Sequence, residues 1–152
     1  MRGAVAVFNR QRRVRVDLRW LRIFAPLALC RCREISANAR FALQQLAEVE
    51  IAIVSDRVIA QVHAQFMNIP GTTDVITFEH GEIVLSAETA RVVATEHGHP
   101  IEEELALYIV HGLLHLNGFE DATPAAAARM QKVQARVLAG CLGEMRLAVN
   151  GG

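Results

Sequence analysis

Residues 110–121 read VHGLLHLNGFED. His111 and His115 are about one helical turn apart, so both imidazoles are expected on the same face of an α-helix. Gly118 suits the left-handed backbone that ends a helix and reverses the chain. That turn would bring the Asp121 carboxylate to the two histidines. Two imidazoles and a carboxylate form a three-ligand set that leaves one coordination position open on a zinc-like ion, so the stretch predicts a metal site.

The spacing His-x3-His-x2-Gly-x2-Asp is similar to the metzincin pattern of a metal-binding helix, a glycine turn and a third ligand. Two positions depart from that pattern. Gly112 stands where a metalloprotease carries its general-base glutamate, and the third ligand would be Asp121 in place of histidine. The alternative is that His111 and His115 are ordinary helix-face residues and that Gly118 only caps the helix.

Composition is that of a globular chain with an uneven charge. The 152 residues are 52% hydrophobic and 21% charged, which allows a packed core, and we expect one domain over residues 1–152. Residues 1–40 hold ten arginines against two acidic residues, a surplus of eight positive charges that the rest of the chain balances. Such a basic segment is suited to phosphate backbones, although arginines also commonly solvate exposed faces.

Cys30, Cys32 and Cys141 form no C-x2-C motif, and we expect them to be reduced. The N-terminus lacks the pattern of a signal peptide, and residues 23–30 are too short an apolar run to span a membrane. These features favour a cytoplasmic protein.

Periodicity predicts an α+β fold in which a small, mixed, four-stranded sheet packs with about five helices. Strands are expected at 4–8, 49–54, 74–78 and 82–85, with 14–17 as a further short strand or a continuation of the first. Helices are expected from 18 to 30 or 32, at 57–67, from 87 to 97, from 101 through the two histidines, and at 125–142. Pro26 is expected to kink or split the first helix.

Three segments resemble the YbeY family of bacterial rRNA maturation factors. The family motif HGxLHLxGYDH is similar to HGLLHLNGFED at residues 111–121. Upstream, TDVITF at residues 73–78 and GEIVLS at 81–86 are similar to the family segments TDVLSF and GDIVIS. Their order and spacing agree with the family over roughly residues 45–140.

The resemblance implies a zincin-like fold and one divalent metal ion, usually zinc. It also implies a metal-dependent, single-strand-specific endoribonuclease that acts in 16S rRNA 3′-end maturation and ribosome quality control. The implied partners are the single-stranded 16S rRNA precursor, the small ribosomal subunit and a ribosome-associated GTPase. Neither a membrane nor DNA is implied as a partner.

Two departures from the family affect the expected site. The third ligand is Asp121 in place of histidine, which lowers the charge of a metal centre by one and favours oxygen-tolerant metals such as manganese more than a three-histidine site does. Met67 stands in the place of an arginine that follows an aromatic residue, here Phe66. Methionine cannot stabilise charge on phosphate. Arg57 or the N-terminal arginines are candidates to replace that arginine.

Other candidate site residues are selected by position. Glu120, Glu79 and His80 are candidate proton-transfer groups, although each is more often a solvated surface residue. Thr73, Asp74 and Thr77 lie in the segment expected to line a groove, where its backbone would bind an extended substrate. His97 and His99 have the look of a second metal pair, but their place beside Gly98 and Pro100 favours surface residues.

Three functional hypotheses remain open at this point. The favoured one is a metal-dependent endoribonuclease. The second is a catalytically weakened or inactive family member that still binds RNA or ribosomal partners, which the residues at 67 and 121 make a serious rival. The third is a peptide or amide hydrolase on a zincin scaffold, against which Gly112 counts.

Overall fold

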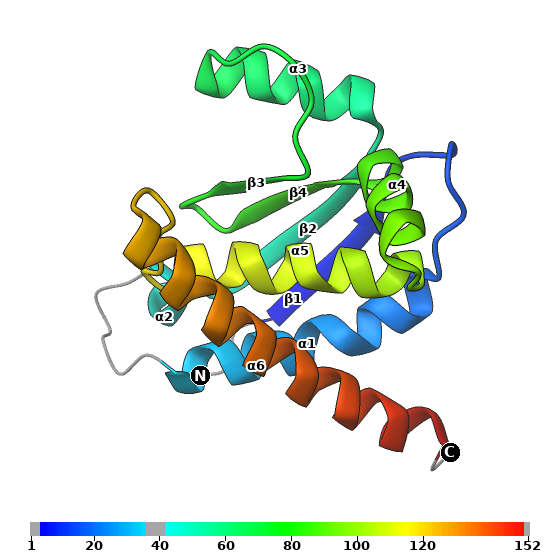
Figure 1. Cartoon of the computed structure of the whole chain (residues 1–152), viewed down its shortest axis with the longest axis vertical. Helices are drawn as coiled ribbons and strands as arrows, with labels where there is room; N and C mark the ends of the chain where they lie inside the picture. Colours follow the sequence, from blue (N-terminus) through cyan, green and yellow to red (C-terminus); the bar gives the residue numbers. More distant parts are fainter. Residues whose placement is uncertain (1–3, 36–41, 151–152) are drawn as a thin grey trace.

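The structure is a computed structural model that describes residues 4–35 and 42–150 (Figure 1). The described strands are β1 (Ala4–Asn9), β2 (Glu48–Val54), β3 (Val75–Phe78) and β4 (Glu82–Ser86). The described helices are α1 (Leu18–Ile35), α2 (Ala42–Gln45), α3 (Asp56–Met67), α4 (Ala87–His97), α5 (Ile101–Leu116) and α6 (Pro124–Asn150). The predicted α+β class is confirmed, and the short α2 lies in a segment whose composition favours a helix but which has no clear cap in the sequence.

The four strands form one mixed sheet in the order β1-β2-β4-β3. β1, β2 and β4 are parallel, and β3 pairs with β4 as an antiparallel edge strand. The turn between β3 and β4 ends at Gly81, whose φ of 106° suits glycine. A Cβ at Gly81 would lie 2.9 Å from the Glu48 carbonyl oxygen, so this turn packs directly against β2.

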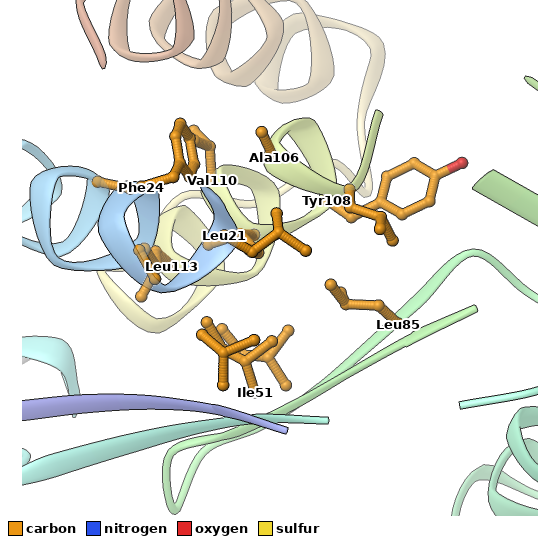
Figure 2. Close-up of a cluster of buried hydrophobic side chains, with 14 of the residues drawn as sticks. Leu21, Phe24, Ile51, Leu85, Ala106, Tyr108, Val110 and Leu113 are labelled. Carbon is orange, nitrogen blue, oxygen red and sulfur yellow. The ribbon is translucent and has the colours of Figure 1, made fainter. Parts of the chain in front are cut away.

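Each face of the sheet carries its own core. The larger core lies between the sheet and helices α1 and α5. Figure 2 shows Leu21 and Phe24 of α1, Ile51 of β2, Leu85 of β4 and Leu113 of α5 within it. The smaller core lies on the opposite face, beneath α3, and its buried members are Ala52, Val54, Ile59, Ile76 and Val84. The alternation of side chains along the strands therefore sends α3 and α5 to opposite faces.

Side-chain oxygens cap the start of three helices. The Asp17 Oδ1 accepts from the Trp20 N–H at 3.1 Å, the Ser55 Oγ from the Val58 N–H at 3.3 Å, and the Ser86 Oγ from the Thr89 N–H at 3.1 Å. Each bond satisfies one of the amide groups that a helix start leaves without an internal partner.

The expected strand at 14–17 was wrong, because these residues form a loop. The Gln11 side chain explains the difference. Its Nε2 donates to the Val14 carbonyl at 2.8 Å, and its Oε1 accepts from the Val14 N–H at 2.9 Å. One side-chain amide thereby satisfies both backbone groups that a neighbouring strand would otherwise bind.

Two helices run further than expected. α1 continues through Pro26 to Ile35, and the proline is exposed while Phe24 and Ala25 are buried. Proline has no N–H to donate, and this missing hydrogen bond therefore lies on the exposed face of α1. The buried face of the helix is not disturbed. α6 runs to Asn150, beyond the expected end at 142.

No helix among the described residues combines the length and the apolar character that a membrane span requires.

Cys32 and Cys141 are buried and Cys30 is exposed, and all three are free thiols. Burial raises the pKa of the Cys141 thiol to about 11, so it stays protonated near neutral pH.

α5 crosses the sheet at very close range through Gly112. A Cβ at this position would lie 2.9 Å from two atoms of the fully buried Ile83 and 3.0 Å from the Thr77 Oγ1. Only a residue without a side chain allows this approach. The glutamate of a metalloprotease would be excluded at this position by the same contacts.

We predict that Gly112→Ala destabilises the protein. Overpacking against Ile83 costs about 1–3 kcal/mol, which exceeds the roughly 0.5–1 kcal/mol that alanine gains over glycine inside a helix. The matched control is Gly143→Ala in α6, where nothing lies within 4 Å of the added Cβ. Only the stabilisation that alanine gives over glycine inside a helix should be seen there. Thermal unfolding should show a lower Tm for Gly112→Ala and an unchanged or higher Tm for Gly143→Ala; equal Tm values would contradict the close-packing argument.

Candidate metal centre

The two histidines of α5 face one another near the end of that helix. The Nε2 atoms of His111 and His115 are 3.0 Å apart, and the ring centroids are 4.6 Å apart with the rings nearly perpendicular. Both side chains are partly exposed, at 27% and 29%. They are therefore accessible to a ligand from solvent while α5 itself is anchored in the core.

Hydrogen bonds set the tautomer of each ring. The His111 Nδ1–H donates to the Gln134 Oε1 of α6 at 2.8 Å, and the His115 Nδ1–H donates to the Phe119 carbonyl at 3.0 Å. In the neutral rings, both Nε2 atoms then carry a lone pair. This arrangement of an Nδ1 held by an oxygen acceptor is typical of metal-ligating histidines.

Asp121 reaches the same point by way of the turn at Gly118. Gly118 has a φ of 93°, and the chain then reverses beyond α5. The Asp121 Oδ2 lies 3.7 Å from the His111 Nε2 and 3.6 Å from the His115 Nε2. Asp121 is exposed, and one donor atom from each of the three residues lies within 4.8 Å of the others.

The donor set fits a divalent cation. Two neutral Nε2 lone pairs that face each other at 3.0 Å repel unless a positive charge lies between them. Bonds of about 2.0–2.2 Å in tetrahedral geometry separate two zinc ligands by about 3.3–3.5 Å. The three observed separations of 3.0, 3.6 and 3.7 Å are close to this spacing.

Electrostatics favour the neutral form of His115. Burial lowers its pKa below the ordinary histidine value, and the nearby His111 lowers it further, against the opposing effect of Asp121. Since a metal ion binds the neutral imidazole, this shift reduces the competition from protons.

A cavity of about 370 Å³ opens beside the two histidines. Its walls come from α3, from β3 with the loop before it, and from the end of α5. The cavity therefore lies at the free edge of the sheet, between α3 on one face of the sheet and α5 on the other. The lining residues are His63, Met67, Thr73, Val75, Ile76, Thr77, Glu79, His111, His115, Leu116 and Glu120.

Several residues selected from the sequence meet in this cavity. Thr73 and Thr77 line it from the β3 side, and Glu79 and Glu120 contribute carboxylates from two different loops. Glu120 directly precedes Asp121, which puts an acidic group beside the three candidate ligands.

Three other candidates do not line the cavity. The Asp74 carboxylate accepts from the Val75 N–H at 2.8 Å and so orders the start of β3. His80 is exposed and stacks on Phe78, with ring centroids 5.5 Å apart. Arg57 lies ten residues before Met67 on α3, or about 15 Å along the helix. It therefore does not lie beside Met67 in the cavity wall.

His63 is a cavity residue that the sequence did not single out. Its ring lies on the same side of α3 as Met67, and its Nδ1–H donates to the Gly71 carbonyl at 3.1 Å. Its spacing of four residues before Met67 was the only available signal. Among the described residues that line the cavity, none is Arg or Lys.

The loop of residues 10–17, which holds four of the N-terminal arginines, lies at the other end of α5. It is attached there because the Asp17 N–H donates to the Glu102 Oε2 at 3.0 Å. Glu102 and His115 are thirteen residues apart on α5, or about 20 Å. Several arginines also bind the protein itself, among them Arg22 to the Val7 carbonyl and Arg31 to Glu144.

His97 and His99 do not form a second site among the described residues. Their rings stack with centroids 5.9 Å apart, but the His99 Nε2 is bonded to the buried Glu104 at 2.8 Å and the His97 Nδ1 to the Val93 carbonyl. The described part of the chain holds one candidate metal cluster, formed by His111, His115 and Asp121.

Known proteins share both the sequence pattern and the fold. The family model described as Endoribonuclease YbeY matches residues 8–141. An Endoribonuclease YbeY from Leifsonia xyli is 35% identical over 111 residues, covering 62% of this chain and 72% of the relative. One from Frankia alni is 32% identical over 130 residues, covering 69% of this chain and 72% of the relative.

The solution structure of TM1509 from Thermotoga maritima aligns with a TM-score of 0.66 over 93% of this chain and 91% of that one, at 21% identity. This likeness concerns the fold alone. The resemblance seen in the three sequence segments is confirmed by the family model and the relatives, and the chain belongs to the YbeY family of endoribonucleases.

Proposed function

We propose that this chain is a metal-dependent endoribonuclease that cuts single-stranded RNA, acting in 16S rRNA 3′-end maturation and ribosome quality control. Its setting would be the small ribosomal subunit, together with a ribosome-associated GTPase. The observation that supports this function most strongly is the convergence of His111, His115 and Asp121 beside an open cavity in an endoribonuclease family member. We further propose that residues 1–152 act as a single domain in the cytoplasm.

The three residues would hold one divalent ion, which we propose to be zinc because two imidazoles and one carboxylate suit it. When bound, such an ion supplies Lewis acidity toward a phosphoryl oxygen and lowers the pKa of water. Gln134 and the Phe119 carbonyl contribute by keeping both Nε2 atoms directed at the site.

Other cavity residues can supply proton transfer and alignment. Glu120 is adjacent to the ligand Asp121 and lines the cavity, so we assign it the role of general base, with Glu79 as the second carboxylate within the same cavity. The His63 Nδ1–H donates to the Gly71 carbonyl, so Nε2 would act as the proton donor to the leaving oxygen when the ring carries a proton on both nitrogens. Thr73 and Thr77 would hydrogen-bond the sugar-phosphate backbone along the free edge of β3.

The second candidate function is RNA binding without cleavage. It is favoured by one observation, which is that no described Arg or Lys lines the cavity and Met67 occupies the place of the family's arginine. Cleavage, by contrast, would have to stabilise the charge that develops on phosphate without a guanidinium from the cavity lining. A peptide-hydrolase function is disfavoured, because the contacts of Gly112 with Ile83 and Thr77 exclude a glutamate there.

We predict that the purified chain binds close to one zinc ion per molecule and that His115→Ala and Asp121→Ala each lose most of it. Removing one of three ligands leaves too few protein donors for a stable site. Elemental analysis after dialysis is the measurement. Glu120→Ala is the matched control, since it removes the neighbouring carboxylate and should keep the metal. Full metal content in Asp121→Ala would show that this carboxylate is not a ligand.

Gln134→Leu should weaken zinc binding about 10- to 100-fold, since the loss of a hydrogen-bonded partner frees the His111 ring and its tautomer. Competition with a chromogenic chelator measures the affinity. Gln131→Leu on the same helix serves as the control, and Gln131 is exposed. Equal affinities for the two variants would show that Gln134 does not orient His111.

Cleavage of a single-stranded RNA oligonucleotide should require the metal and fall about 100-fold or more in Glu120→Gln, because general acid–base groups contribute about 10²–10⁴-fold. The assay compares the loaded chain, the chain with a chelator, and the zinc-reloaded chain. Chelator-sensitive cleavage supports the nuclease. If the chain binds stoichiometric zinc and binds RNA but does not cut it, the nuclease function is wrong and RNA binding without cleavage is supported.

A further inference from the structure

Three rings form a row beside the candidate cavity. The Phe66 and Phe78 rings meet edge to face with centroids 5.6 Å apart, and the Phe78 and His80 rings stack with centroids 5.5 Å apart and planes 23° from parallel. Phe66 comes from the end of α3, Phe78 from the end of β3 and His80 from the turn before β4. We call these three residues the aromatic row.

Each residue of the aromatic row is next in the chain to a residue that lines the cavity. Phe66 directly precedes Met67, and Phe78 stands between Thr77 and Glu79, and these three neighbours line the cavity. A strand that leaves the cavity past Met67 or Glu79 would therefore meet the row.

The middle ring of the row is anchored, and the two end rings are exposed. Phe78 is half-buried and packs against the smaller core beneath α3. Phe66 is 63% exposed, which is unusual for a phenylalanine ring because most of its apolar surface stays in water. The row is thus a supported surface with an exposed aromatic face, the arrangement on which a flat ligand can stack.

We infer that the aromatic row is a stacking site for RNA bases that flank the scissile phosphate, an inference that rests on the proposed function. Single-stranded RNA offers unpaired bases with free faces, whereas the bases of a duplex are stacked on one another. Base–aromatic stacking is sequence-tolerant and needs no cation. It therefore provides strand affinity where the described cavity wall has carboxylates at Glu79 and Glu120 but no Arg or Lys.

The row also gives a physical source for single-strand specificity. A duplex that approaches the free edge of β3 would leave Phe66 without a base to cover it, whereas a flexible strand can turn one base onto the ring. An apolar protein segment could pack against a leucine at position 66 as well as against Phe66. Base stacking, by contrast, requires the flat ring of Phe66. This difference selects the test.

The decisive variant is Phe66→Leu, which keeps an apolar side chain and removes the ring. Binding of a fluorescein-labelled single-stranded oligonucleotide is measured by anisotropy with the full-length chain, in chelator so that no strand is cut and again with zinc. The expected affinity loss is about fivefold to 150-fold, the usual value of one base–aromatic contact. Phe8→Leu is the matched control, because Phe8 is a 38%-exposed ring on β1, the opposite edge of the sheet.

Two further readouts report stacking directly. A 2-aminopurine base in the oligonucleotide should lose fluorescence on binding to the wild-type chain and recover it in Phe66→Leu. An oligonucleotide with abasic residues should bind the wild-type chain as weakly as the intact one binds Phe66→Leu. Thermal unfolding confirms that the exposed substitution leaves the fold intact.

The outcomes separate this inference from the function beneath it. Weaker binding in Phe66→Leu with normal binding in Phe8→Leu supports the aromatic row. If Phe66→Leu binds RNA as tightly as the wild-type chain does, the stacking role of the aromatic row is wrong. The proposed nuclease function is not affected by that result. A wild-type chain that neither binds nor cuts RNA overturns both.

Discussion

The contact of Gly112 with Ile83 and Thr77 is the constraint on which the candidate site depends. It lets α5 lie so close to β3 and β4 that a Cβ would meet atoms at 2.9–3.0 Å. Because His111 precedes Gly112, this approach sets the ligand pair beside the free edge of the sheet. The same residue removes the position from which a metalloprotease glutamate would act, so one packing requirement governs both the geometry and the chemistry of the cavity.

Supporting bonds extend the site beyond its three candidate ligands. Gln134 on α6 holds His111, and the Phe119 carbonyl in the turn after α5 holds His115. α6 is in turn tied to α1 by the ion pair between Arg31 and Glu144. The His111 ring is therefore oriented by a helix later in the chain, and the His115 ring by the turn that directly follows its own helix. Both bonds limit how far either ring can rotate when a ligand binds.

The charge of the cavity differs from that of a site built to attract phosphate at long range. Glu79 and Glu120 line it, whereas the arginine-rich loop is attached to the opposite end of α5. A strand would meet attraction mainly at close range, from a bound cation, from His63 and from the exposed Phe66 ring. Under the proposed function, short-range recognition of this kind would favour a flexible strand over a rigid duplex, because a flexible strand can adapt to the cavity.

The sequence by itself determined the α+β class, most strand positions and the pairing of His111 with His115, because hydrophobic periodicity and one helical turn are local properties. It also indicated that Gly118 would turn the chain toward Asp121. Gln134, His63 and the exclusion of Arg57 and His80 from the cavity were decided only by the tertiary structure. Each depends on how separate elements pack, and no local pattern encodes the distance between α3, β3, α5 and α6.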